Sequence, residues 1–188
     1  KISRRGDQMN RALDLLGVNL IFHPVADTNQ GWAFPVWEDP ERFSVVFQDD
    51  KFQIFKNNTS LDRAKLFYDY EKIQDKKEII KRFYSTDFDF RNTLILERDP
   101  DTSSKFKVQS SKLTNGSAEI ISYTPNKVII KAKTDKPALL FLSDNYYPGW
   151  KAYVNGKQAE ILRADYTFRA VVVPQEESTV LFIFEPGF

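Results

Sequence analysis

The second half of the chain is built from short apolar segments, each too short for an average helix and separated from the next by turn residues. Val128, Ile130 and Ala132 alternate with two lysines, which is typical of a strand with one face in water. Short strands at such close intervals predict an antiparallel β-sandwich of jelly-roll or immunoglobulin-like type over residues 105–188. The strand-like segments in this half are FKV, SAEIISY, KVIIKAKT, PALLFLS, WKAYV, KQAEIL, TFRAVVV and STVLFIFE.

The first half, residues 1–104, mixes helical and strand patterns and predicts a smaller α+β part. Apolar spacing predicts helices over residues 7–16 and 74–84, the second with Ile80, Phe83 and Tyr84 on one side. Two strand-like runs flank Asp49-Asp50 as a hairpin would, and RAKLFYDYE adds a third run. The fold class is therefore mainly β with some α, and the sequence leaves open whether the first half adds strands to the same sandwich.

Two turn signals lie in the stretch SDNYYPGWKAYVNGK. Pro148 and Gly149 suit the two central positions of a type II turn, because proline presets its own φ and glycine tolerates a positive φ. Asn155 and Gly156 suit the two-residue type I′ loop of a hairpin for the same steric reason. A strand is thus expected to start at Trp150 and to reverse after Val154.

The register of this hairpin follows by counting outward from the Asn-Gly loop. Ala152 should face Ala159, and Trp150 should share their side of the sheet, because side chains alternate between faces. We expect Trp150 to be a core residue of the sandwich, since large aromatic side chains dominate core burial. The same counting places Lys151 opposite Glu160 on the outer face.

Four aromatic residues are candidate ligand contacts. Tyr146 and Tyr147 precede the first turn, where phenol rings at a rim can stack on sugars or fill a partner interface, and packing within the fold is an equal alternative. Trp32 and Trp37 lie in an aperiodic loop rich in aromatic and turn residues, where they would either form a sugar-stacking platform or be buried under the loop. We favour burial for this second pair.

Composition removes most catalytic and cofactor chemistry. With no cysteine and a single histidine, the chain offers no thiolate metal site, no cysteine nucleophile and no His-rich cluster, so we expect no metal, no cofactor and no catalytic residue. Lys and Arg (27) nearly balance Asp and Glu (26), which argues against nucleic acid as a partner. Carboxylate pairs such as Asp87 with Asp89 or Asp144 with Glu160 would suit a glycosidase only at the right separation in space.

The segment YPGWKAYVNGK, together with the strands that follow it and the final EPGF, resembles the C-terminal extracytoplasmic part of YfhO-type bacterial membrane proteins. Weaker similarities lie upstream in LDLLGVNLIF, FQIFKNNTSLDRAKLFYDYE and FDFRNTLILE, so the resemblance covers nearly the whole chain. The sequence departs from the expected pattern at Asp62 and Phe90, where we expect proline.

This family looks like lipid-linked glycosyltransferases with many membrane helices and with their chemistry in membrane-proximal loops. The resemblance implies that this chain is a non-catalytic domain outside the membrane, held by transmembrane helices of its own full-length chain, which would be its partner. It also implies an envelope glycan as a ligand; a purely structural or protein-interaction module is the alternative. Because the chain opens on Lys1 without a signal segment, we expect a piece of a longer protein.

Overall fold

The computed structural model describes residues 6–25, 36–100 and 115–186, with the side chain of Trp37 left aside. The chain divides into two compact units, residues 1–62 and 63–188. Both consist mostly of antiparallel strands, so the predicted class, mainly β with some α, is confirmed. The first strand-like segment of the predicted sandwich, residues 106–108, lies outside the described residues.

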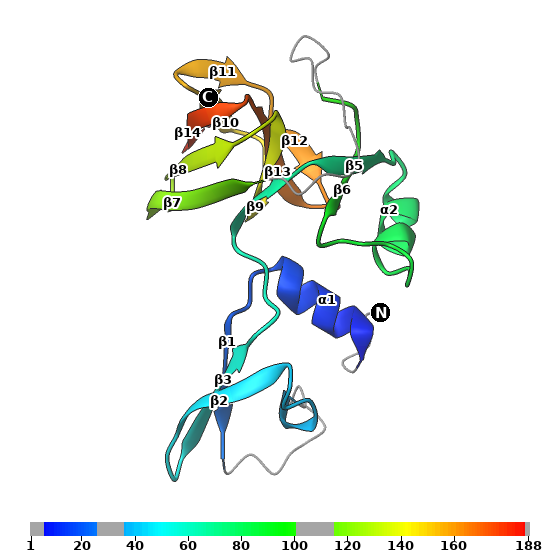
Figure 1. The fold of residues 1–188 in the computed structure, drawn as a ribbon, viewed down its shortest axis with the longest axis vertical. Coiled ribbons are helices and arrows are strands. Elements are labelled where there is room, and N and C mark those ends of the chain that lie inside the picture. The colour runs from blue at the N-terminus through cyan, green and yellow to red at the C-terminus, as the bar shows by residue number, and fades with distance from the viewer. Residues whose placement is uncertain (1–5, 26–35, 101–114, 187–188) are drawn as a thin grey trace. The chain divides into compact units, whose positions relative to one another are not determined.

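The first unit contains one helix and a small sheet (Figure 1). Helix α1 (Asp7–Leu15) ends where expected, with Gly17 just beyond it at a φ of 65°. The predicted hairpin around Asp49 is also present, because the Asp49 carboxylate accepts the backbone N–H groups of Lys51 and Phe52. The remaining elements are β1 (Leu20–Pro24), the 3-10 helix η1 (Val36–Glu38), β2 (Phe43–Gln48) and β3 (Phe52–Asn57), and the sheet order is β1-β3-β2.

A buried carboxylate fixes α1 to this sheet. Asp14 accepts hydrogen bonds from Arg42 Nη2 at 2.5 Å and from Asn57 Nδ2 at 2.9 Å, and also from the hydroxyl of Thr59. These partners come from the start of β2 and the end of β3, so three separate segments meet at one side chain. A buried charge of this kind is tolerated because it is paired and hydrogen-bonded.

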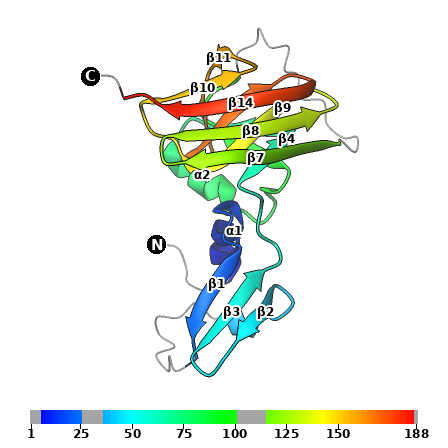
Figure 2. The ribbon, with the colours of Figure 1, turned by 90° about the vertical axis from the view of Figure 1, so that its left-hand side faces the viewer.

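The second unit contains two sheets. In Figure 2 the strands β10, β14, β8 and β7 run side by side, and they form most of a five-stranded sheet of order β11-β10-β14-β8-β7. A six-stranded sheet has the order β4-β9-β13-β12-β6-β5. The strands are β4 (Ala64–Phe67), β5 (Asp69–Lys72), β6 (Thr93–Leu96), β7 (Gly116–Thr124), β8 (Lys127–Thr134), β9 (Ala138–Asn145), β10 (Trp150–Val154), β11 (Lys157–Ala159), β12 (Leu162–Ala164), β13 (Phe168–Val173) and β14 (Glu176–Phe184).

The run RAKLFYDYE forms two strands, not the single strand expected. Tyr68 separates β4 from β5, and these strands occupy opposite ends of the six-stranded order. One residue spans only about 3.5 Å, so the sheet has to curl until its two edges approach each other. The predicted division at residues 104 and 105 falls inside this unit, where β4 pairs with β9 and β6 pairs with β12.

Helix α2 (Lys76–Phe83) lies in the crossover between β5 and β6, which pair in parallel and therefore need such a connection. Asp75 caps the helix by accepting the N–H groups of Lys77 and Glu78. Of the three residues expected on one side, Phe83 is buried and Tyr84 is half-buried, whereas Ile80 is 43% exposed. Ile79 is buried instead, so the buried face of the helix runs through Ile79 and Phe83.

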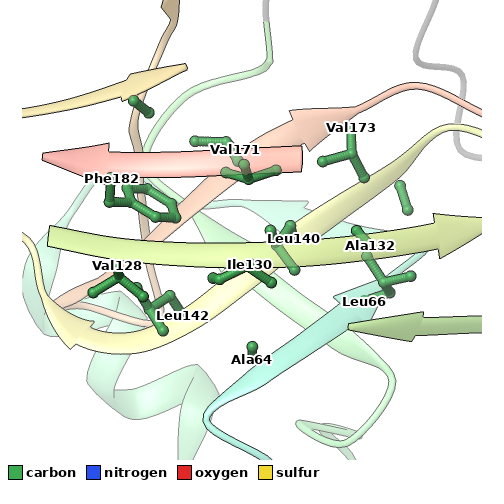
Figure 3. Close-up of a cluster of buried hydrophobic side chains, with 13 residues drawn as sticks. Ala64, Leu66, Val128, Ile130, Ala132, Leu140, Leu142, Val171, Val173 and Phe182 are labelled. Atoms are coloured by element: carbon green, nitrogen blue, oxygen red, sulfur yellow. The ribbon is translucent and has the colours of Figure 1, made fainter. Parts of the chain in front are cut away.

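The core of this unit lies between the two sheets. Figure 3 shows Val128 and Ile130 of β8, in the five-stranded sheet, packed with Leu140 of β9 and Val171 of β13, in the six-stranded sheet. All of these side chains are at most 1% exposed. The lysines that alternate with them on β8 point outward, as the sequence pattern predicted.

The hairpin of β10 and β11 has the predicted register near its loop. Ala152 pairs with Ala159, and Asn155 and Gly156 have φ values of 51° and 77°, as a type I′ loop requires. Trp150 packs against the core cluster. The predicted pair of Lys151 with Glu160 is wrong, because Lys151 binds Glu185 and Glu160 binds Arg98. Strand β10 also pairs with β14, where Trp150 lies opposite Phe184, and this register brings Lys151 close to Glu185.

Candidate functional site

The connection between β9 and β10 carries both tyrosines proposed as ligand contacts. The N–H of Trp150 donates to the carbonyl of Tyr147 at 3.4 Å, and Gly149 has a φ of 98°, so the predicted turn is confirmed. Tyr146 is held by its backbone N–H, which donates to the carbonyl of Thr167. The backbone of this segment is therefore fixed at both ends.

The two tyrosines have different environments. Tyr147 is 64% exposed, and its ring lies 6.4 Å from that of Phe184, which in turn lies 5.6 Å from Trp150. Tyr146 is half-buried, and the guanidinium of Arg163 lies 4.7 Å from its ring centre. The turn thus presents Tyr147 to solvent on an aromatic support, while Tyr146 is engaged with a neighbouring strand.

A buried arginine lies beneath this turn. Arg169 of β13 is only 2% exposed, and its guanidinium lies 4.0 Å from the ring centre of Trp150 and 5.2 Å from that of Phe182. Burial lowers the pKa of Arg169, since desolvation disfavours the charged form. Its Nε and Nη1 atoms are buried and have no hydrogen-bond partner among the described residues.

Asp144 at the end of β9 joins this arginine to the surface. Its Oδ2 accepts from Arg169 Nη2 at 2.7 Å, and its Oδ1 accepts from Arg63 Nη2 at 2.5 Å. The hydroxyl of Tyr123 donates to the same carboxylate at 3.1 Å, and Arg63 lies 4.6 Å from the Tyr123 ring centre. Burial is the largest single influence on Arg63 and acts to lower its pKa, but the hydrogen bonds and charges of Asp144 and Tyr123 together outweigh it, and the pKa is raised.

We call these seven residues the turn cluster: Arg63, Tyr123, Asp144, Tyr147, Trp150, Arg169 and Phe184. Each residue contacts the next: Tyr123 contacts Asp144, which binds Arg169, and Arg169 lies against Trp150. Trp150 in turn contacts Phe184, and Phe184 contacts Tyr147. Arg63, Tyr123 and Arg169 were not predicted from the sequence as site residues. One signal was available for Arg169, a charged residue inside the otherwise apolar strand FRAVVV.

The other predicted contacts cannot be added to this cluster. Trp32 lies outside the described residues, and so does the side chain of Trp37, whose backbone is in η1. Their role as a sugar-stacking platform stays a prediction.

The carboxylates considered for glycosidase chemistry each have a cation or another donor. Asp87 binds Arg82 at 2.8 Å, Glu160 binds Arg98 at 2.6 Å, and Asp89 accepts from the side chain of Asn92. Within residues 6–25, 36–100 and 115–186, no group of three or more His, Cys, Asp or Glu side chains is placed to hold a metal ion.

A separate open groove of about 810 Å³ lies where β7 begins and β8 ends. It is lined by polar and charged residues such as Asn115, Lys133 and Glu176, without an aromatic ring. The groove therefore lacks a flat apolar surface of the kind that Tyr147 supplies in the turn cluster.

Comparison with known proteins identifies the family. The family model described as bacterial membrane protein YfhO matches residues 57–188, which include the whole turn cluster, so the chain belongs to this family. No curated protein and no solved structure matched the chain. Among the described helices, none is long and apolar enough to cross a membrane.

Proposed function

We propose that this chain is a non-catalytic domain on the extracytoplasmic side of a bacterial membrane, where it binds or positions an envelope glycan or a lipid-linked acceptor. In this proposal it is joined to the transmembrane part of its own full-length chain, and the parent protein acts as a lipid-linked-sugar glycosyltransferase. Membership of a bacterial membrane protein family supports the membrane setting.

The observation that carries the glycan proposal is the exposed ring of Tyr147, which is joined through Phe184 and Trp150 to a hydrogen-bonding network. The apolar face of a pyranose stacks on a flat aromatic ring, and its hydroxyl groups need charged or polar partners that are already oriented. Tyr147 rests on Phe184, and Arg63 and Tyr123 are held by the Asp144 carboxylate. Ordering the ring and its polar neighbours in advance lowers the entropy lost on binding.

The absence of catalysis is part of the proposal. A general acid or nucleophile has to be available to the reacting atoms, whereas Asp144 contacts two guanidinium groups and a phenol. This arrangement suits a carboxylate that holds its neighbours in position. A structural or protein-interaction module without glycan affinity remains the alternative function.

Calorimetric titration and ligand-observed NMR with oligosaccharides from bacterial envelope polymers test the proposal. We expect Tyr147→Ala to lower affinity by about tenfold or more, because stacking on one ring contributes on the order of 1.5 kcal/mol. Tyr153→Ala is the matched control, since Tyr153 lies on the same hairpin but on the face opposite Ala152 and Trp150. Absence of binding to every glycan by the unchanged protein would contradict the proposal.

A further inference from the structure

One face of the sheet in the first unit is apolar and exposed. The register places Phe22 of β1, Ile54 of β3 and Phe47 of β2 opposite one another, so their side chains lie on the same face. Phe22 is 60% exposed and Phe47 is 50% exposed. The ring of Phe52 lies 4.6 Å from that of Phe22 and extends the surface along β3.

The opposite face of this sheet forms the core of the unit. Phe43 and Phe55 are buried there with Val36, and Leu13 of α1 and Ile21 pack against them. The fold of the first unit therefore does not require apolar residues on its outer face. We define this outer apolar face as Leu20, Phe22, Phe47, Phe52 and Ile54.

Exposed apolar side chains are concentrated in this unit. Seven of the twelve large hydrophobic residues that are exposed in the described chain belong to residues 6–62, although that unit is the smaller one. Scattered exposed apolar residues are ordinary, but a contiguous patch marks an interaction surface.

The charges around the outer apolar face indicate what it contacts. Strands β1, β2 and β3 contain no Asp or Glu, and Lys56 pairs with both Leu20 and Ser44 at the end of the same face. Acidic residues adjoin the sheet at the hairpin loop, with Asp49 and Asp50, and just before β2, with Asp39 and Glu41. The carboxylates of Asp49 and Asp39 already accept backbone N–H groups. A flat apolar face with a lysine at its margin is complementary to a bilayer surface that carries anionic headgroups.

We propose that the outer apolar face lies on the surface of a lipid bilayer, with its phenylalanine rings at the boundary between headgroups and hydrocarbon. The family match supports this choice of partner over a soluble one, because a member of a membrane protein family works within reach of a bilayer. The proposal is independent of glycan binding, which concerns residues of the second unit.

Single-cysteine spin labelling of the full chain tests the contact, since the sequence contains no native cysteine. Nitroxides at Phe22→Cys and Phe47→Cys should become more accessible to oxygen and less accessible to a water-soluble nickel complex when vesicles of phosphatidylethanolamine and phosphatidylglycerol are added. A nitroxide at Ile121→Cys, an exposed position on β7, should remain in water. Labels at residues 22 and 47 that stay in water would overturn the proposal.

Vesicle sedimentation with the cysteine-free protein gives a second readout. Phe22→Ser with Phe47→Ser should lower the partition coefficient by at least about tenfold, because each buried ring contributes on the order of that factor. The control changes Lys76 and Lys77 to Gln on α2, where both lysines are exposed. An equal loss in the control would assign binding to α2 and overturn the proposal.

The same labels distinguish a second copy of the chain as the occupant. Dipolar broadening between labels at residue 22 without vesicles, together with a dimer in sedimentation equilibrium, would show that the face is a homodimer interface and would overturn the proposal. A monomer whose labels respond only to vesicles supports it.

Discussion

Replacing Asp144 with alanine removes a carboxylate that contacts a buried guanidinium and an exposed one. Asp144 lies 2.7 Å from Arg169 and 2.5 Å from Arg63, and its side chain is 11% exposed. After the substitution Arg169 would keep its charge in a site that is 2% exposed, against the rings of Trp150 and Phe182. An uncompensated buried charge is among the most destabilising features a substitution can leave.

The expected loss of unfolding free energy is about 3 kcal/mol, the lower end of the range for breaking a buried ion pair. The lower end applies because Asp144 is partly hydrated, and because Arg63, whose side chain is 47% exposed, can be solvated once its partner is gone. Asp144→Ala with Arg169→Met should recover part of the loss, since an apolar side chain of similar length does not need the carboxylate.

This loss is measured within the second unit by urea denaturation, with hydrogen exchange in peptides from β9 and β13 as the probe of unfolding. Asp99→Ala is the control, because the ion pair of Asp99 with Lys72 is open to solvent, and its removal should leave the unfolding free energy nearly unchanged. If Asp144→Ala were as mild as Asp99→Ala, the argument that Arg169 depends on this carboxylate would be refuted.

Two further substitutions test backbone and pH effects. Gly149→Ala should destabilise the second unit by roughly 1–3 kcal/mol in the same urea assay, because alanine is strained at this positive φ. The added Cβ would also meet the Phe184 ring at 2.8 Å. Gly156→Ala is the control and should cost less, because Gly156 also has a positive φ but nothing lies within 4 Å of its added Cβ. Burial raises the pKa of Asp165 to about 7 in the folded protein, so the unfolded state loses its proton first and stability should fall as pH rises from about 4 to 7. Asp165→Asn, which retains an acceptor for the N–H of Ile95 and tolerates the positive φ, should remove this slope in urea titrations at several pH values; an unchanged slope would show that another group titrates.

The strands and turns of the second unit were largely predictable from the sequence, because their signals are local. Pro148 with Gly149, and Asn155 with Gly156, specify turns through the backbone conformations open to these residues, and the alternation along KVIIKAKT specifies which side of β8 is buried. Once the Asn-Gly loop was placed, the register of β10 with β11 and the inward side of Trp150 followed.

The candidate site was less predictable. Tyr147 could be named from its place beside a turn, but its exposure and the partial burial of Tyr146 depend on Phe184 and Arg163, which are distant in sequence. The two arginines that contact Asp144 were not predicted, because sequence spacing carries no information on which strand ends meet.

What the sequence determined by itself was the class of fold, the positions of most strands and the two turns, since these depend on side-chain periodicity and on the φ preferences of glycine, proline and asparagine. Only the tertiary structure decided that RAKLFYDYE separates into β4 and β5 at opposite ends of one curled sheet, and that Arg169 is enclosed between Trp150 and Asp144. These outcomes depend on contacts between segments up to about eighty residues apart. At that separation many partners have similar local suitability, and only simultaneous packing of both sheets selects one.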